Sequence, residues 1–150
     1  MKKDLGVKPY MFPIPTLMVA TYGEGDSVNV MQMGWGGVCS DTMVMLHIAE
    51  THKTAKNIKE RGAFTLSIAD IEHIKEADFF GIASGSKMVD KFKRSGLHAV
   101  KSSRVDAPVV EEFPLTLECK VVSSQVPPAK PGVPDYNFVG EYMPKYSKIY

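Results

Sequence analysis

The sequence of 150 residues lacks the features of a secreted, membrane-bound or strongly charged protein. Eighteen basic residues balance seventeen acidic ones, so the formal net charge is only +1, which argues against nucleic acid or a membrane surface as a partner bound by bulk charge. Only two cysteines occur, Cys39 and Cys119. They form no CxxC pair, so we expect a reduced, intracellular setting with both thiols buried as small hydrophobes.

Long apolar runs are also missing. No stretch of the sequence reaches the ~18 apolar residues that a membrane span needs. The start of the chain, MKKDLGVKPYMFPIPT, is broken by prolines before the apolar region of a signal peptide could form. We therefore expect the protein in the cytoplasm.

Several motifs that would carry chemistry are absent as well. There is no HxH, HExxH or Cys–His spacing typical of a metal site. There is no GxGxxG or GxxxxGK[ST] loop, which argues against a Rossmann or P-loop nucleotide site. No cysteine stands beside a His–acid pair that would mark a nucleophile. The sequence therefore predicts no metal and no catalytic side chain.

What the sequence does contain is a series of short apolar segments separated by turn residues. The length is that of one domain with a real core, and we expect residues 1–150 to form a single domain. Strands are predicted at 15–22, 28–35, 43–49, 63–69, 114–122 and 136–142, and helices at 52–61 and 71–82, with a brief helical turn within 84–96. Residues 36–42 are predicted to interrupt the sheet, and 126–134, with four prolines in nine residues, to form a loop.

This pattern predicts a mainly β fold, a closed or nearly closed antiparallel barrel with inserted helices. The strand at 43–49 is apolar on both faces, so we expect it to be covered on both sides. The segment 71–82 would place Ile71, Ile74, Ala77 and Phe80 on one buried side of a short helix.

The start of the helix at 52–61 carries an unusual group of polar side chains, Thr51, His52, Lys53 and Thr54. The first N–H groups of a helix lack intrahelical partners, and the helix dipole makes that end positive. With added hydroxyl and cationic groups, this is the chemistry that a phosphate needs. The alternative is that Thr51 is only the N-cap of the helix and that its neighbours are solvated.

Two further stretches could contact a ligand. Residues 29–37, NVMQMGWGG, combine glycines that let a flat ligand approach the backbone with Met and Trp side chains that offer apolar contact. The alternative is a barrel strand ending in a glycine-rich turn, with Trp35 in the core. Residues 90–96, DKFKRSG, are either a solvated turn or a second positive arm that reaches the same anion.

Taken together, several stretches of the chain resemble the flavin reductase-like family, especially its flavoredoxin branch. They are PYMFPIPTLMVAT (9–21), NVMQMGWGG (29–37), THKTAKNIKERGAFTLSI (51–68), EADFFGIASG (76–85), DKFKRSGL (90–97), VDAPVVEEFPLTLECKV (105–121) and FVGE (138–141). The resemblance implies an FMN-binding split β-barrel of the Greek-key type, bound FMN, and a homodimer with flavin sites near the subunit interface.

The resemblance also implies which residues hold the cofactor. Backbone groups of residues 31–34 would bond the polar edge of the isoalloxazine, with Trp35 packed nearby. Residues 49–54 would hold the ribityl chain and the phosphate, and Lys91 would be a further phosphate contact. The expected cofactor-binding residues are Asn29, Met31, Gln32, Met33, Gly34, Trp35, Ala49, Glu50, Thr51, His52, Thr54 and Lys91.

The function that the resemblance implies is that of an FMN-dependent oxidoreductase, similar to NAD(P)H:flavin reductases, or of a pure electron carrier. Electrons would pass from NAD(P)H or a redox partner through FMN to an acceptor. One alternative is a split-barrel oxidase or nitroreductase that uses the same FMN. Another is a non-catalytic flavin- or haem-binding module, or a sensor, on the same barrel.

The chain departs from the family pattern in two places. Family members often carry Arg where this chain has His52. They also usually continue for several strand-forming segments after the stretch that matches FVGE, whereas only nine residues follow it here. The resemblance therefore implies that the C-terminal part of the domain is shortened or rearranged.

Overall fold

The computed structural model describes residues 4, 6, 12–125 and 135–142. The predicted loop at 126–134 lies outside these residues. The strands are β1 (Leu17–Tyr22), β2 (Val28–Met33), β3 (Gly36–Ser40), β4 (Met43–Ala49), β5 (Ala63–Ile68), β6 (Ala99–Lys101), β7 (Pro108–Val110), β8 (Leu115–Gln125) and β9 (Asp135–Tyr142). The helices are α1 (Lys53–Arg61), α2 (Ile74–Ile82) and α3 (Lys91–Ser95), with a 3-10 turn, η1, at Glu24–Asp26.

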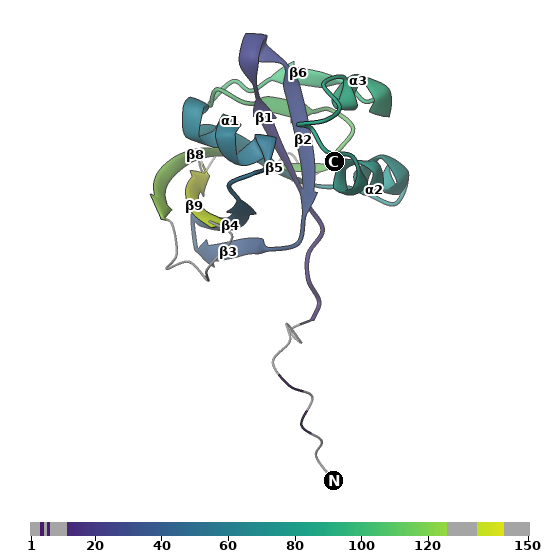
Figure 1. Ribbon diagram of the computed structural model, residues 1–150. Helices are drawn as coiled ribbons and strands as arrows, with labels where there is room; N and C mark the ends of the chain where they lie inside the picture. The colour runs from purple at the N-terminus through teal and green to yellow at the C-terminus, as the bar shows by residue number, and fades with distance from the viewer. Residues whose placement is uncertain (1–3, 5, 7–11, 126–134, 143–150) are drawn as a thin grey trace.

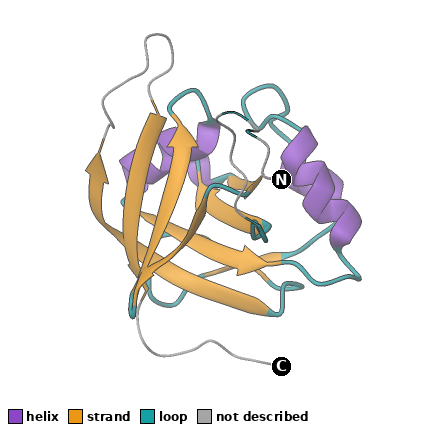
Figure 2. Ribbon diagram, turned by 90° about the horizontal axis from the view of Figure 1, so that it is seen from below, coloured by secondary structure: helices purple, strands orange, loops and turns teal. Residues whose placement is uncertain are grey.

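Seven of these strands form one sheet in the order β2-β1-β5-β8-β9-β4-β3, and every neighbouring pair is antiparallel. The sheet curls around its own interior, as Figures 1 and 2 show. Strands β6 and β7 form a separate ribbon. The predicted fold class, mainly β and antiparallel with inserted helices, is confirmed, and the order places β2 and β3 at the two edges of the described sheet.

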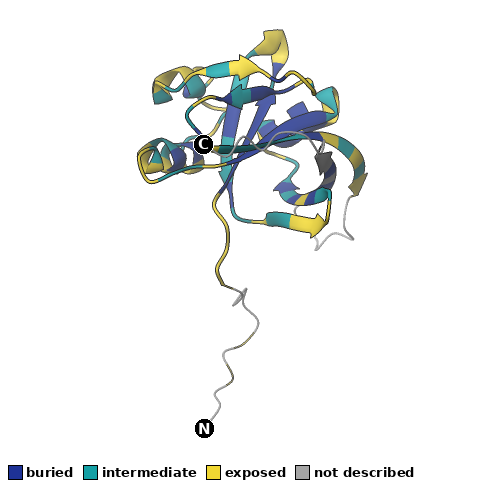
Figure 3. Ribbon diagram, turned by 180° about the vertical axis from the view of Figure 1, so that it is seen from behind, coloured by how far each residue is buried: buried dark blue, intermediate teal, exposed yellow. Residues whose placement is uncertain are grey.

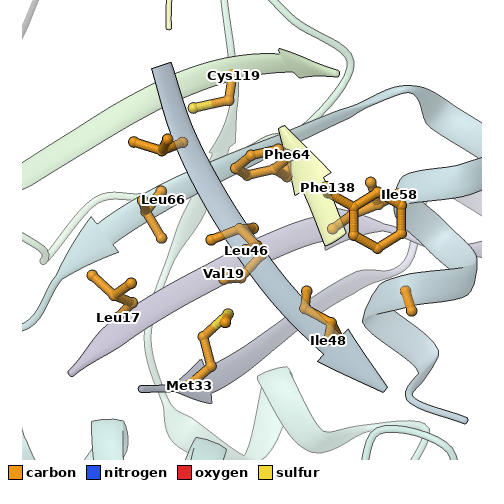
Figure 4. Close-up of a cluster of buried hydrophobic side chains, with 12 residues drawn as sticks. Leu17, Val19, Met33, Leu46, Ile48, Ile58, Phe64, Leu66, Cys119 and Phe138 are labelled. Atoms are coloured by element: carbon orange, nitrogen blue, oxygen red, sulfur yellow. The ribbon is translucent and has the colours of Figure 1, made fainter. Parts of the chain in front are cut away.

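The larger hydrophobic core fills the interior of the curled sheet. Phe64, Leu46 and Phe138 are each at most 1% exposed there, and α1 adds Ile58 from the side (Figure 4). A smaller core on the opposite face of β1 and β2 packs against Ala77 and Phe80 of α2. Strand β1 supplies Leu17 and Val19 to the first core and Met18 and Ala20 to the second. The alternation of side chains along a strand thus serves two cores at once.

The structure corrects the prediction that residues 36–42 interrupt the sheet. Residues 36–40 form β3, which pairs with β4. The reason lies in Gly36, where an added Cβ would stand 2.8 Å from the carbonyl oxygen of Met45 and 3.2 Å from the Leu17 side chain. This glycine allows a close approach of two strands, whereas the sequence alone suggested a turn.

Three burial predictions are also wrong. Met45 on β4 is 43% exposed, so this strand is covered on one face only in the single chain. Ile71 is 87% exposed, and α2 begins only at Ile74, which is 54% exposed. The later start follows from Asp70, whose carboxylate accepts the His73 N–H at 3.0 Å and closes a turn before the helix. Cys39, expected to be buried, is exposed on β3.

The other cysteine behaves as predicted. Cys119 is fully buried in the larger core, and burial raises the pKa of its thiol to about 12. Such a thiol stays protonated and unreactive at neutral pH.

Among the described residues, no helix is both long and apolar enough to span a membrane. No group of three His, Cys, Asp or Glu side chains in the same residues could hold a metal ion.

Candidate functional site

The principal cavity of the described residues, about 910 Å³ in volume, surrounds the outer edge of β2. The start of α1 and the end of α2 lie on opposite sides of this strand, as Figure 1 shows. The cavity is lined by residues 14–16 before β1, by Asn29 and residues 31–35, by residues 47–49, by residues 52–54, by residues 80–85 and by Lys91. A cavity of this size falls in the range of cofactor sites in proteins.

The start of α1 forms one end of the cavity. His52 is the N-cap residue, and its side chain makes no capping bond, so the prediction of Thr51 as N-cap is wrong. The chain turns one residue later than expected because the His52 N–H donates to the Ala49 carbonyl at 3.0 Å. The Ala55 N–H donates to the His52 carbonyl at 3.1 Å, so the N–H groups of Lys53 and Thr54 begin the helix without intrahelical partners.

Thr54 is tied to β2 by a buried hydrogen bond. The Asn29 Nδ2 donates to the Thr54 Oγ1 at 2.9 Å, and the two residues are 4% and 2% exposed. On its other side, the Asn29 Oδ1 lies where a Cβ on Gly85 would have to stand. Strand β2, helix α1 and the segment after α2 therefore meet at this one amide, and any larger residue at position 85 would have to displace it.

Lys91 contributes a buried ammonium group from the opposite wall. The residue is 3% exposed, and its Nζ donates to the Phe80 carbonyl at 2.8 Å and lies 5.6 Å from the centre of the Phe80 ring. No carboxylate among the described residues forms an ion pair with it. Burial lowers the pKa of Lys91 from 10.5 to about 8. An uncompensated cation in such a place favours the binding of an anion.

The edge of β2 offers backbone groups along the middle of the cavity. Within the described residues, β1 is the only strand paired with β2, so alternate N–H and C=O groups of β2 face away from the sheet. Helix α2 approaches this edge closely at Gly81, where an added Cβ would collide with the Oε1 of Gln32. The Met31 side chain packs against the larger core from the same strand.

Trp35 stands at the rim of the cavity. It is 56% exposed, so the alternative that it belongs to the core is wrong. Its carbonyl accepts the His47 N–H at 2.8 Å, which fixes the corner between β2 and β3 against β4. The exposed end of β3 continues outward from this corner (Figure 3).

The structure brings most of the predicted cofactor-binding residues to one place. The cavity lining includes Asn29, Met31, Gln32, Met33, Gly34, Trp35, Ala49, His52, Thr54 and Lys91. Glu50 and Thr51 do not line it: the Glu50 carboxylate pairs with Lys59 at 3.1 Å, and Thr51 is exposed. The cofactor role of all twelve residues stays a prediction.

Sequence reasoning missed other residues of the lining. They are Ile14, Pro15, Thr16, His47, Ile48 and residues 80–85, whereas Lys53, which also lines the cavity, belongs to the predicted polar group at the helix start. The available signal was the pair of glycines at 81 and 85, four residues apart at the end of an otherwise apolar segment. Such spacing favours a close approach of another backbone or a ligand.

Comparison with known proteins places the chain in a class. The family model of the flavin reductase like domain matches residues 10–135, and the chain belongs to this family. The family indicates a flavin-binding redox function and supports FMN, the cofactor expected from the sequence. The predicted family is thereby confirmed.

Two solved structures make the likeness more particular. The flavoredoxin of Desulfovibrio vulgaris (Miyazaki F) is 35% identical with a TM-score of 0.86, and the alignment covers 95% of this chain and 74% of that one. The flavoredoxin from Methanosarcina acetivorans is 25% identical with a TM-score of 0.79, covering 97% and 76%. These likenesses support the flavoredoxin branch and confirm the expected split-barrel fold.

A curated relative of similar sequence is an uncharacterized protein of Archaeoglobus fulgidus. It is 32% identical over 115 residues, which are 75% of this chain and 63% of the relative. The chain thus spans less than two thirds of the length of this relative.

Proposed function

We propose that this protein binds FMN in the cavity around β2 and serves as an oxidoreductase or electron carrier of the flavoredoxin type. The observation that carries the proposal is the buried ammonium of Lys91, which faces the same cavity as the start of α1. A doubly charged phosphate between the two would satisfy the free N–H groups of the helix and the uncompensated lysine together.

The rest of the cavity suits the rest of the cofactor. The outward N–H and C=O groups of β2 are hydrogen-bonding partners for the polar edge of an isoalloxazine, and Met31 and Trp35 offer apolar contact. The ribityl chain would pass along residues 47–49, which line the stretch of the cavity beside the start of α1. Ser84 and Gly85, which also line the cavity, would lie beside the phosphate.

Bound FMN would supply the electron-transfer chemistry. The chain itself would bind and orient the cofactor, exclude water from one of its faces, and stabilise negative charge at the ring edge through the backbone N–H groups of β2. We name no side chain as acid or base. We propose NAD(P)H or a redox protein as the electron donor and the cytoplasm as the location, both as predicted from the sequence.

The experiment that tests this function is an anaerobic titration. The purified protein, loaded with FMN, is titrated with NADH, with NADPH and with dithionite while the flavin absorbance is followed. Bleaching by a nicotinamide supports a reductase, and bleaching by dithionite alone supports a carrier. A protein that takes up no FMN would overturn both. Turnover of a nitroaromatic compound or of oxygen would favour the nitroreductase or oxidase alternative.

A prediction concerns His52. We expect His52→Ala to weaken FMN binding about three- to tenfold, because a hydrogen-bond donor beside the phosphate is lost. The fold should hardly change, since the His52 side chain is exposed and makes no capping bond. The matched control is Lys56→Ala, an exposed cation of the same helix outside the cavity. Equal FMN affinity in both variants, measured by flavin fluorescence, would contradict the placement of the phosphate.

We also propose that a second copy of the chain covers the edge strand β3 and the neighbouring part of β4. Val38 on β3 and Met45 on β4 are 72% and 43% exposed on opposite faces of this strand pair. Trp35, which is 56% exposed, precedes β3 at the cavity rim. Exposed apolar side chains gathered along one edge of a sheet mark interaction surfaces, and the homodimer expected from the sequence would bury them.

The surface is tested by a charge substitution. We expect Val38→Asp to shift the protein from dimer to monomer in sedimentation velocity, because a carboxylate would be desolvated in the interface. Val89→Asp, at a residue that is 77% exposed between α2 and α3, is the control and should leave the dimer intact. If Val38→Asp remains dimeric, the interface lies elsewhere.

A further inference from the structure

The buried hydrogen bond between Asn29 and Thr54 has a defined donor and acceptor, and this direction matters for an anion in the cavity. The Asn29 amide donates to the Thr54 Oγ1 at 2.9 Å. A threonine hydroxyl has one donor and two acceptor positions. Because Asn29 occupies an acceptor position, the O–H proton of Thr54 remains available to a third partner. Among the described residues, none accepts a hydrogen bond from this hydroxyl.

Burial and one close contact hold this arrangement in place. Thr54 is in the first turn of α1 and only 2% exposed. The Asn29 Oδ1 occupies the space beside Gly85 that a Cβ would fill, so the amide lies between this glycine and the helix. Both residues line the cavity. The hydroxyl therefore has a proton that it can donate to an occupant of the cavity at the start of α1.

We infer that Asn29 is a positioning residue: it orients the Thr54 hydroxyl as a donor to the cofactor phosphate and sets the preference of the site for a phosphorylated flavin over riboflavin. This inference rests on the proposed function. It changes the role expected for Asn29, which acts on the phosphate through Thr54 instead of contacting the cofactor itself.

The chain contains a matched control for this pair. The Asn57 Nδ2 donates to the Thr21 Oγ1, also at 2.9 Å, and these residues are 4% and 0% exposed. The chemistry and the burial are the same, but neither residue lines the cavity. Loss of Asn57 should therefore cost stability to a similar degree without affecting the choice of flavin.

The test is a double-mutant cycle read as the ratio of riboflavin to FMN dissociation constants. We expect Thr54→Val to lower this ratio about tenfold, the worth of one hydrogen bond to a charged group. Asn29→Ala should lower it at least about threefold, and the double variant no further than Thr54→Val alone, because the two residues act as a unit. Asn57→Ala should leave the ratio unchanged while lowering the melting temperature.

The outcomes separate the two proposals. A parent protein that binds riboflavin as tightly as FMN overturns the proposed phosphate site itself. If the parent protein prefers FMN but Asn29→Ala keeps the same preference, only the role of Asn29 is overturned. The same holds if the losses of the two single variants multiply in the double variant. Should Asn29→Ala fail to fold, Asn29→Ser replaces it, because a serine is too short to reach Thr54 and predicts the same loss.

Discussion

Lys91→Met is expected to make the FMN-free protein more stable and at the same time to remove most of its preference for FMN over riboflavin. At neutral pH the folded protein holds a buried ammonium whose only partners among the described residues are the carbonyl and the ring of Phe80. Its lowered pKa of about 8 corresponds to a destabilisation of about 3 kcal/mol. Subtracting about 1 kcal/mol for the lost hydrogen bond to Phe80 leaves a gain of about 2 kcal/mol.

The same substitution, Lys91→Met, should weaken FMN binding while it raises the stability of the FMN-free protein. A buried, charge-assisted hydrogen bond to a phosphate is worth about 10- to 100-fold in affinity, and riboflavin lacks that phosphate. Denaturant unfolding of the FMN-free variant and flavin titrations measure the two effects separately. Lys93→Met, an exposed lysine of the same helix α3, should change neither. A variant that is less stable and keeps its FMN preference would contradict the role of Lys91.

The Lys91 ammonium also predicts how the free energy of unfolding and the FMN affinity depend on pH. Between about pH 8 and the ordinary lysine pKa of 10.5, the unfolded chain holds a proton at Lys91 that the folded, FMN-free protein has released. The contribution of Lys91 to the free energy of unfolding therefore rises with pH across this window, because the unfolded state binds more protons at this group. Above pH 9.0 the contribution of Cys119 opposes it, because the folded state keeps a thiol proton that the unfolded chain releases. FMN affinity should fall over the same range, since the neutral amine no longer attracts the phosphate. In Lys91→Met the rise in stability between about pH 8 and pH 9.0 and the fall in FMN affinity should both disappear.

Gly140→Ala is expected to destabilise the protein by about 2–3 kcal/mol through overpacking. An added Cβ at this position of β9 would stand 2.5 Å from Cζ and 2.7 Å from Cε1 of Phe64, and 3.2 Å from the Cys119 Cβ. The Phe64 ring is completely buried, so it cannot move aside without disturbing the larger core (Figure 4). Thermal and denaturant unfolding measure the loss.

The control for this substitution is Gly37→Ala on β3, where an added Cβ would meet nothing within 4 Å. It should change stability by less than about 0.5 kcal/mol. FMN preference should remain at the parental value in both variants, because neither residue lines the cavity. Equal stability of the two variants would show that the contact between Gly140 and Phe64 does not limit the packing of β9.

Local patterns in the sequence were enough to predict most of the elements. The hairpin of β1 and β2, the strands β4, β5 and β9, and the helix α1 follow from apolar segments bounded by turn residues. Gly62 and Gly96 end α1 and α3 with φ values of 64° and 76°, as the glycine positions predict. Strand β3 was missed because its pairing depends on a close approach to β4, a contact between strands that no local pattern contains.

The candidate site, like the fold, was predictable from the sequence only in part. The sequence by itself determined which residue types were available for an anion and a flat ligand, since a helix start rich in donors and a strand rich in Gly and Met are visible in short stretches. Only the tertiary structure decided that Lys91 is buried and uncompensated, and that Asn29 donates to Thr54 across 25 positions of chain. Burial and the direction of a hydrogen bond are set by residues distant in sequence, and they determine what these side chains can do.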